Sequence, residues 1–230
     1  MHTAALNPTP VFSNKFVSVS QPTVDQFPAI TGHIGPIASD SIYTRDEEIF
    51  GERETAEYVY QVLSGAVRTY KMLSDGRRQI AAFHLPGDVF GLESRSTHRL
   101  TADAIVDTTV RLVKRSYLEK AAGGDLSVAR KLWTITSAEL KHAEDHMLLL
   151  GQKSAMEKVA TFLLEMDGRL AVAGMMALPM CRRDIADYLG LTLETVSRAL
   201  SQLQAKGVLG LSGARQIELR NRRHLCNINA

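Results

Sequence analysis

The sequence predicts an α+β protein composed of an N-terminal antiparallel β-roll, one long helix and a C-terminal winged helix-turn-helix. Three observations predict it: β-rich segments separated by turn residues, a heptad of apolar and small residues, and two short helical segments that meet at a glycine. We divide the chain into an irregular arm (1–38), a β-roll (39–115), a dimerisation helix (116–151) and a winged helix-turn-helix (152–230).

The composition is that of an ordinary globular protein. Apolar residues make up 45% and charged residues 23% of the chain, which excludes collagen-like, low-complexity and disulfide-scaffold proteins. The two cysteines, Cys181 and Cys226, predict a reducing compartment. The first residues lack the features of a signal peptide and the longest apolar run is too short for a membrane span, so we expect a cytoplasmic protein that does not enter the membrane.

Charge is distributed unevenly along the chain. Residues 1–151 contain 16 Lys and Arg against 18 Asp and Glu, whereas residues 152–230 contain 11 against 7. A basic C-terminal third beside a slightly acidic body favours a polyanion as the partner of the smaller part. An excess of four positive charges is also common on a solvated surface, so this pattern alone does not identify a partner.

The arm and the roll are predicted from prolines and turn residues. Five of the seven prolines lie within 1–38, which favours irregular structure there. Short strands at intervals of about ten residues, separated by turns such as Ser64-Gly65 and Ser74-Asp75-Gly76, are typical of an antiparallel barrel or roll. The predicted strands are 58–63, 66–72, 79–85, 101–104 and 109–114.

A heptad seam predicts the long helix. From Leu126 to Leu150, apolar and small residues alternate at spacings of three and four, which is typical of a helix packed against a partner helix. The alternative is an amphipathic helix that lies on its own roll. We favour a homodimer, with an interface made by Trp133, Thr136, Leu140, Ala143, Met147 and Leu150.

Two histidines on the same helix have the spacing of metal ligands. His142 and His146 lie four residues apart, and Glu139 precedes them by three. Polar residues on an exposed helix face would show the same spacing, and we favour that interpretation. We therefore expect no metal site.

The segment from Arg182 to Ser201 predicts two short helices joined at Gly190. Ala186 is small where two helices cross closely, Gly190 can adopt the left-handed conformation that ends a helix, and Thr192 can cap the next helix. The second helix then has a buried stripe of Val196, Ala199, Leu200 and Leu203.

The opposite face of the second helix has the chemistry of base reading. It presents Glu194, Ser197, Arg198 and Ser201 at spacings of three and four. Arg can bond guanine O6 and N7 together, and Glu can accept from cytosine N4. A solvated face with a Glu-Arg pair is the alternative. Downstream, 207–209 and 215–220 predict a two-stranded wing, whose phosphate contacts would be Arg215, Arg220, Arg222 and Arg223.

Over nearly its whole length the sequence resembles the Crp/Fnr family of bacterial transcription regulators and, within it, the FixK subgroup. The segments Leu189-Gly190-Leu191-Thr192 and Glu194-Thr195-Val196-Ser197-Arg198 carry the resemblance. It implies a cyclic-nucleotide-binding-like roll and a homodimer that binds an inverted TTG/CAA repeat of double-stranded DNA. It also implies base reading by Leu193, Glu194, Ser197 and Arg198, with backbone contacts from Arg182, Arg183, Thr192, Thr195, Ser201 and Arg215.

The resemblance does not identify a small molecule or cofactor that the roll of this chain binds. Members that bind cyclic AMP have a Gly-Glu pair, whereas this chain has Leu92 at the Glu position and a poor phosphate match from His98 to Thr101. No cysteine precedes Cys181, which removes the ligands of an N-terminal iron-sulfur cluster. We expect no cofactor; the alternative is a ligand-gated regulator with a small molecule in the roll, or a haem on His33, His84 or His98.

Cys181 immediately precedes the first helix of the DNA-binding motif. A thiol at a helix N-terminus beside Arg182 and Arg183 favours the thiolate, and its oxidation would add polar or negative groups near DNA phosphate. Inhibition of DNA binding by this oxidation is one hypothesis. A poor N-cap or a small buried residue is the other interpretation.

We expect a transcription regulator, and an activator that contacts RNA polymerase is what the family implies. Candidate polymerase contacts are 167–178 and the exposed turn at 74–78. The chain has no His-x-His pair, Gly-rich phosphate loop or nucleophile elbow, and the run Asp46-Glu47-Glu48 is typical of a solvated surface. We therefore do not expect an enzyme.

Overall fold

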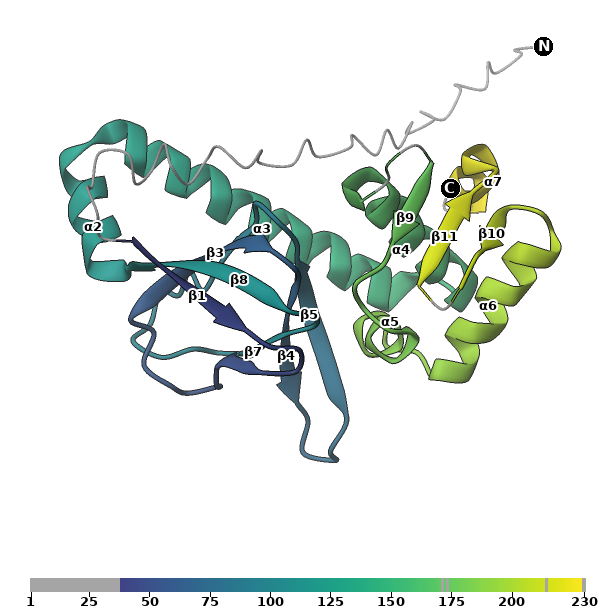
Figure 1. The fold of residues 1–230 in the computed structure, drawn as a ribbon, viewed down its shortest axis with the longest axis horizontal. Coiled ribbons are helices and arrows are strands. Elements are labelled where there is room, and N and C mark those ends of the chain that lie inside the picture. Colours follow the sequence, from purple (N-terminus) through teal and green to yellow (C-terminus); the bar gives the residue numbers. More distant parts are fainter. Residues whose placement is uncertain (1–37, 171, 173, 214, 229–230) are drawn as a thin grey trace, which may run out of the picture.

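The computed structural model describes residues 38–170, 172, 174–213 and 215–228. The predicted arm lies outside the described residues except for its last residue, Ala38, which begins the first strand. Figure 1 shows a β-roll and a helical C-terminal part, joined by one long helix that passes along the roll. Within the described part of the chain, no helix is both long and apolar enough to cross a membrane.

Two antiparallel four-stranded sheets form the roll, with strand orders β1-β8-β3-β6 and β2-β7-β4-β5. All five predicted strands are present. The structure adds three strands that the alternation of apolar and polar residues does not reveal: β2 and β6 are too short, and β1 is too polar. The strands are β1 (Ala38–Tyr43), β2 (Glu48–Phe50), β3 (Tyr58–Ser64), β4 (Val67–Met72), β5 (Arg78–His84), β6 (Val89–Phe90), β7 (Thr101–Ala104) and β8 (Thr108–Lys114).

The predicted helix 116–151 is two helices, α2 (Arg115–Gly124) and α3 (Leu126–Gln152). Asp125 between them has extended backbone, and its side chain accepts a hydrogen bond of 2.7 Å from the Ser127 N–H. Two glycines before it lower the helix propensity, and the aspartate caps the new helix. The prediction of one continuous helix over 116–151 is therefore wrong at Asp125.

The C-terminal part is a winged helix-turn-helix with more elements than expected. A third strand, β9, pairs with β11 on the side opposite β10, so the predicted two-stranded wing has three strands in the order β10-β11-β9. The elements are α4 (Ala155–Leu170), β9 (Met175–Ala177), α5 (Arg182–Leu189), α6 (Leu193–Ala205), β10 (Leu209–Leu211), β11 (Gln216–Leu219) and α7 (Arg222–Ile228).

One hydrophobic core is shared between the roll and the C-terminal part. Phe83 from β5, Phe162 from α4 and Tyr188 from α5 belong to the same cluster of buried residues. The Phe83 ring centroid lies 5.1 Å from that of Tyr188 and 6.3 Å from that of Phe162. The position of the helix-turn-helix relative to the roll is therefore determined in part by apolar packing.

A second cluster of aromatic rings fills the interior of the roll. Phe50 stacks on His98 with ring centroids 3.6 Å apart, and Tyr60 stacks on Phe90 at 5.2 Å. All four side chains are buried, and His98 is 2% exposed. The middle of the roll is therefore occupied by the protein's own rings.

Two histidines have pKa values shifted in opposite directions. His84 is buried, bonds the Thr69 hydroxyl at 3.1 Å and stacks on Phe90, and burial, reinforced by the charge of Arg169, lowers its pKa to about 3. His142 on α3 faces Glu165 on α4, and the hydrogen bond to this carboxylate raises the pKa of His142 above 6.5.

These shifts predict two different titrations by NMR. Between about pH 8 and 5, the ring signals of His84 should stay at one chemical shift, whereas those of His142 should titrate with a midpoint above 6.5. An unfolded His84 binds a proton at about 6.5 and the folded one only near 3, so its contribution to stability decreases as pH falls through this range. A His84 signal with a midpoint near 6.5 would contradict its enclosure; His142→Gln assigns the second signal.

Candidate DNA interface

The turn between α5 and α6 has the geometry that the sequence predicts. Gly190 lies in the left-handed region at φ 61°, and the Leu191 N–H donates to the Ala186 carbonyl at 3.0 Å. Ala186 and Val196 are both buried where the two helices meet. A side chain at position 190 would be strained by this backbone conformation, which is why the turn requires glycine.

Helix α6 begins and packs as expected. The Thr192 hydroxyl accepts a hydrogen bond of 3.2 Å from the Thr195 N–H, which is an N-cap. The buried residues of α6 are the four of the predicted stripe, which confirms the helix phase: Val196, Ala199, Leu200 and Leu203. In Figure 1, α6 lies at the outer edge of the C-terminal part, on the side away from the roll.

The predicted base-reading residues all lie on the first turns of α6. Glu194 and Arg198 are exposed, whereas Leu193 and Ser197 are half-buried. Hydrogen bonds in the first turn, from the Glu194 N–H and the Thr192 side chain, lower the pKa of Glu194, and the nearby Arg183 and Arg198 act in the same direction. The carboxylate is therefore available as an acceptor beside a guanidinium donor.

The predicted phosphate contacts surround this face. Arg182 reaches from α5 to α6, where Nη1 lies 3.5 Å from the Ser197 Oγ. Arg183, Thr192 and Thr195 line a groove of about 800 Å³ between the β4–β5 hairpin and the turn. Ser201 is exposed one turn further along α6, and Arg215 lies half-buried just before β11.

Two of the wing arginines have partners within the protein. Arg220 Nε lies 2.9 Å from Glu218 on the same strand, and Arg222 Nη1 lies 3.1 Å from Asp167 on α4. Arg222 also begins helix α7, which the sequence pattern did not reveal. These ion pairs with partners in the chain make both arginines weaker candidates for phosphate contact than Arg182 and Arg183.

Cys181 occupies the N-cap position of α5 and is half-buried and unpaired. Its N–H donates to the Asp184 carboxylate at 3.0 Å. The next residue, Arg182, is the one that extends to Ser197 on α6. The thiol therefore lies at the edge of the surface formed by the two helices, one residue from a predicted phosphate contact.

Asp184 carries an ion network that sequence reasoning missed. Its Oδ1 accepts from Arg68 Nη1 at 2.8 Å and from Arg78 Nη2 at 2.6 Å, and both arginines belong to the roll. Burial raises the pKa of Asp184, but the hydrogen bonds from Cys181 and the charges of the arginines outweigh it and lower the pKa overall. No local pattern could reveal these pairs, because their members lie more than 100 positions apart.

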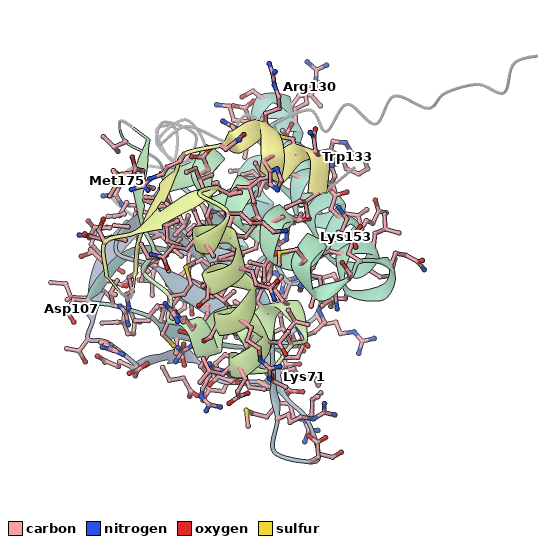
Figure 2. The ribbon with its side chains drawn as sticks, turned by 90° about the vertical axis from the view of Figure 1, so that its right-hand side faces the viewer. Lys71, Asp107, Arg130, Trp133, Lys153 and Met175 are labelled. Atoms are coloured by element: carbon pink, nitrogen blue, oxygen red, sulfur yellow. The ribbon has the colours of Figure 1, made fainter. Side chains whose placement is uncertain are left out.

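Most of the predicted seam on α3 is exposed. Trp133 is 75%, Leu140 60% and Met147 66% exposed, and Thr136 and Ala143 are exposed beside them. Figure 2 shows Trp133 at the periphery of the molecule. Leu150 differs, because it is half-buried against the shared core and its side chain approaches Gly190.

The histidine pair on α3 holds the junction with α5 together. His146 Nε2 lies 2.8 Å from the Tyr188 carbonyl oxygen, and His142 Nε2 lies 3.2 Å from the Tyr188 hydroxyl. Within the described ranges, no group of three histidine, cysteine or acidic side chains is arranged to hold a metal ion. The four-residue spacing of His142 and His146 thus allows both side chains to contact Tyr188.

Two family profiles match the chain in the same order as its two parts. The profile of the cyclic nucleotide-binding domain matches residues 41–122, and that of the Crp-like helix-turn-helix domain matches residues 157–228. Together they cover the roll and the DNA-binding part.

Similar proteins were found among curated sequences and solved structures. The nitrogen fixation regulation protein FixK of Azorhizobium caulinodans is 43% identical over 86% of this chain and 82% of its own length, and FixK of Rhizobium meliloti is 37% identical over 85% and 93%. The structure of FixK2 from Bradyrhizobium japonicum superposes with a TM-score of 0.83 at 75% identity, over 84% of this chain and 98% of that one.

A CooA mutant from Carboxydothermus hydrogenoformans, at 21% identity and a TM-score of 0.73 over 86% of this chain and 90% of that one, shows the same fold. The two profile matches, the identity to the FixK proteins and the helix-turn-helix geometry agree with one another. The chain belongs to the Crp/Fnr family of transcription regulators, which are not enzymes, and is FixK-like within it.

Proposed function

We propose that this chain is a homodimeric, sequence-specific activator that reads an inverted TTG/CAA repeat with α6 and contacts RNA polymerase in the cytoplasm. The observation that carries the proposal is the outward face of α6, where Glu194 and Arg198 lie one turn apart on a helix capped by Thr192. Two relatives, AadR of Rhodopseudomonas palustris and FnrA of Stutzerimonas stutzeri, are named as activators of transcription.

Each base-reading residue has a distinct role in this proposal. Arg198 bonds guanine O6 and N7, and Glu194 accepts from the N4 amine of the paired cytosine. Leu193 packs on a thymine methyl, and Ser197 bonds a neighbouring base or phosphate. Backbone contacts from Arg182, Arg183, Thr192, Thr195, Ser201 and Arg215 fix the register on the duplex but carry no sequence information.

Replacing Arg198 with Ala should reduce the affinity for the TTG/CAA repeat by about 5- to 150-fold, because one bidentate base contact contributes about 1–3 kcal/mol. Fluorescence anisotropy on the repeat and on a scrambled duplex at one salt concentration measures both affinities. The loss should be confined to the repeat. Arg130→Ala is the charge-matched control, since Arg130 is exposed near the distant end of α3; an equal loss on both duplexes would show that Arg198 contacts only phosphate.

Dimerisation through α3 rests on the exposure of its seam. Burial of apolar surface stabilises association by about 25 cal/mol per Å², and Trp133, Leu140 and Met147 are large side chains that are mostly exposed in the single chain. A two-fold pairing of α3 with its copy would bury all three and bring two copies of α6 to one side of the dimer. Two-fold symmetry matches an inverted repeat with half-sites one helical turn apart.

Leu140→Lys should convert the dimer to a monomer, because it places a charge in the middle of the seam. Sedimentation velocity on the reduced protein without DNA gives the oligomeric state directly. Thr134→Lys is the matched control: Thr134 is exposed on α3 but lies outside the seam. A Leu140→Lys protein that sediments as an unchanged dimer would refute this interface.

The roll of this chain does not fit a cyclic nucleotide. Leu92 offers no acceptor for a ribose hydroxyl, His98 is stacked under Phe50, and the Arg99 guanidinium is paired with Glu93 at 3.1 Å. A haem would require a histidine that can reach the iron, whereas His84 bonds Thr69, and His98 is 2% exposed and stacked on Phe50; His33 lies outside the described residues. These contacts support a regulator that binds DNA without an effector, over the ligand-gated alternative.

Oxidation of Cys181 is the proposed control on DNA binding. A peroxide oxidises the thiolate to a sulfenic acid: the sulfur bonds one oxygen of the peroxide, the O–O bond breaks, and hydroxide leaves. A second peroxide transfers one more oxygen to the sulfenic acid and leaves as water, and the sulfinic acid so formed is negatively charged at neutral pH, unlike the sulfenic acid or the thiol. That charge would lie at the N-terminus of α5, one residue from Arg182, where DNA phosphate is expected to bind.

Peroxide should therefore weaken operator binding by the wild-type protein at least tenfold and leave Cys181→Ser unaffected. Anisotropy before and after treatment measures the change, and mass spectrometry identifies the oxidised residue. Cys226→Ser is the control, because Cys226 is the second unpaired cysteine and is exposed on α7. If Cys181→Ser loses binding as the wild type does, Cys181 is not the sensor.

A further inference from the structure

Two arginines on the roll hold the first helix of the DNA-binding motif. Arg68 on β4 and Arg78 on β5 both donate to Oδ1 of Asp184, and Arg78 also donates to Oδ2 of Asp187 from Nε and Nη2, at 3.0 and 2.9 Å. Gln79 adds a hydrogen bond of 3.2 Å to the Tyr188 carbonyl oxygen. Contacts at Asp184, Asp187 and Tyr188, within little more than one turn, thus connect the β4–β5 hairpin to α5.

The network is buried, which makes its geometry specific. Arg68 is 8% and Asp184 3% exposed, and Arg68 is also held by Asp103 at 2.9 Å and by Asp46 at 3.1 Å. Fork-shaped guanidinium groups that bind carboxylates at several points fix direction as well as distance. A buried ion pair contributes little net stability over an apolar contact, so its best-supported role is to select one arrangement among several.

We propose that Arg68, Arg78 and Asp184 form a latch that fixes the direction of α6 relative to the dimer helix, and thereby determines which separation of DNA half-sites the dimer accepts. This inference rests on the proposed function. Asp184 is a positioning residue that contacts no base. The partner recognised through the latch is a duplex with one half-site spacing.

The latch can act on α6 because α5 and α6 move together. Ala186 and Val196 pack against each other's helices in one core, and Gly190 joins the helices by a tight turn. Asp184 also accepts the N–H of Cys181, so the latched carboxylate and the start of α5 are one unit. A rotation of α5 on the roll is therefore transmitted to the base-reading face.

DNA makes such a rotation measurable. One added base pair moves a half-site by about 3.4 Å and rotates it by roughly 35° about the duplex axis. A rigid dimer meets only one separation without strain. A dimer whose DNA-binding parts are loosely held accepts neighbouring separations at little cost.

Arg78→Gln tests the latch without altering the DNA-binding motif. The Arg78 side chain lines the open groove beside the turn, so water can fill the space that the shorter Gln leaves, and Arg68 still neutralises Asp184. Arg77→Gln is the matched control, because it removes the same charge from the same hairpin, and within the described part of the chain the Arg77 guanidinium is paired with Asp75 of that hairpin. Both variants should unfold within a few degrees of the wild-type protein.

Anisotropy gives the dissociation constants for the inverted repeat and for the same repeat with one base pair inserted or deleted at its centre. We expect the wild type and Arg77→Gln to bind one spacing about tenfold or more tightly than its neighbours. In Arg78→Gln this preference should be at least threefold smaller, and the loss of affinity for the preferred spacing should be smaller than the loss of preference. An unchanged preference in Arg78→Gln would overturn the assignment of spacing to the latch.

A measurement without DNA separates failure of the latch from failure of the proposed function. Spin labels at Lys114 on β8 and Gln204 on α6, in a chain with both cysteines changed to Ser and diluted with unlabelled protein, report the distance between the two parts. The distribution should be narrow in the wild type and broader in Arg78→Gln. An equally narrow distribution in Arg78→Gln would refute the latch. If Arg78→Gln broadens as expected but the wild type does not bind the repeat, the proposed function is refuted and with it the assignment of spacing.

Discussion

The packing of Tyr188 is the interaction on which the arrangement of the molecule depends. Its ring stacks on His146 of α3 with centroids 4.1 Å apart and contacts Phe83 of the roll at 5.1 Å. Its carbonyl oxygen accepts from Gln79 and lies 2.8 Å from His146 Nε2. One residue of the helix-turn-helix is thus bound to both the roll and the long helix, and burial of its ring makes these contacts mutually dependent.

From this junction outward, polarity increases toward the DNA-binding face. Apolar packing of Tyr188 and Phe162 and the ion pairs of Asp184 hold α5, whereas Arg183, at the start of the helix, is exposed. The order has a physical reason: apolar contact supplies most of the free energy, and directional charge pairs specify orientation. Phosphate binding then needs only exposed cations on a helix whose position is already fixed.

Much of the fold and of the site could be predicted from the sequence where the causes are local. The turn at Gly190, the Thr192 cap and the buried stripe of α6 depend on residues within a few positions of one another, and all three are confirmed. The heptad on α3 correctly predicted a helix, because helical periodicity is also local, and the packing of this helix against a second copy stays a prediction.

What could not be predicted depends on residues distant in the sequence. The ion network joins positions 68 and 78 to position 184, and β9 becomes a strand only because β11 pairs with it. The interpretation of His142 and His146 as polar residues on an exposed helix face was wrong for the same reason: His146 is buried, and the partner of both histidines, Tyr188, lies more than 40 positions away. Leu150 fits the heptad but is half-buried at the junction, which no periodicity distinguishes from a seam position.

We propose that this FixK-like chain reads DNA as it stands, without an effector in the roll. The most direct test is fluorescence anisotropy of the purified, thiol-reduced protein with no added ligand, on an inverted TTG/CAA repeat and on a scrambled duplex at the same salt concentration. Binding to the repeat that is at least about a thousandfold tighter than to the scrambled duplex is the predicted result. Equal, weak binding to both duplexes would contradict the account and would show that the roll requires a ligand.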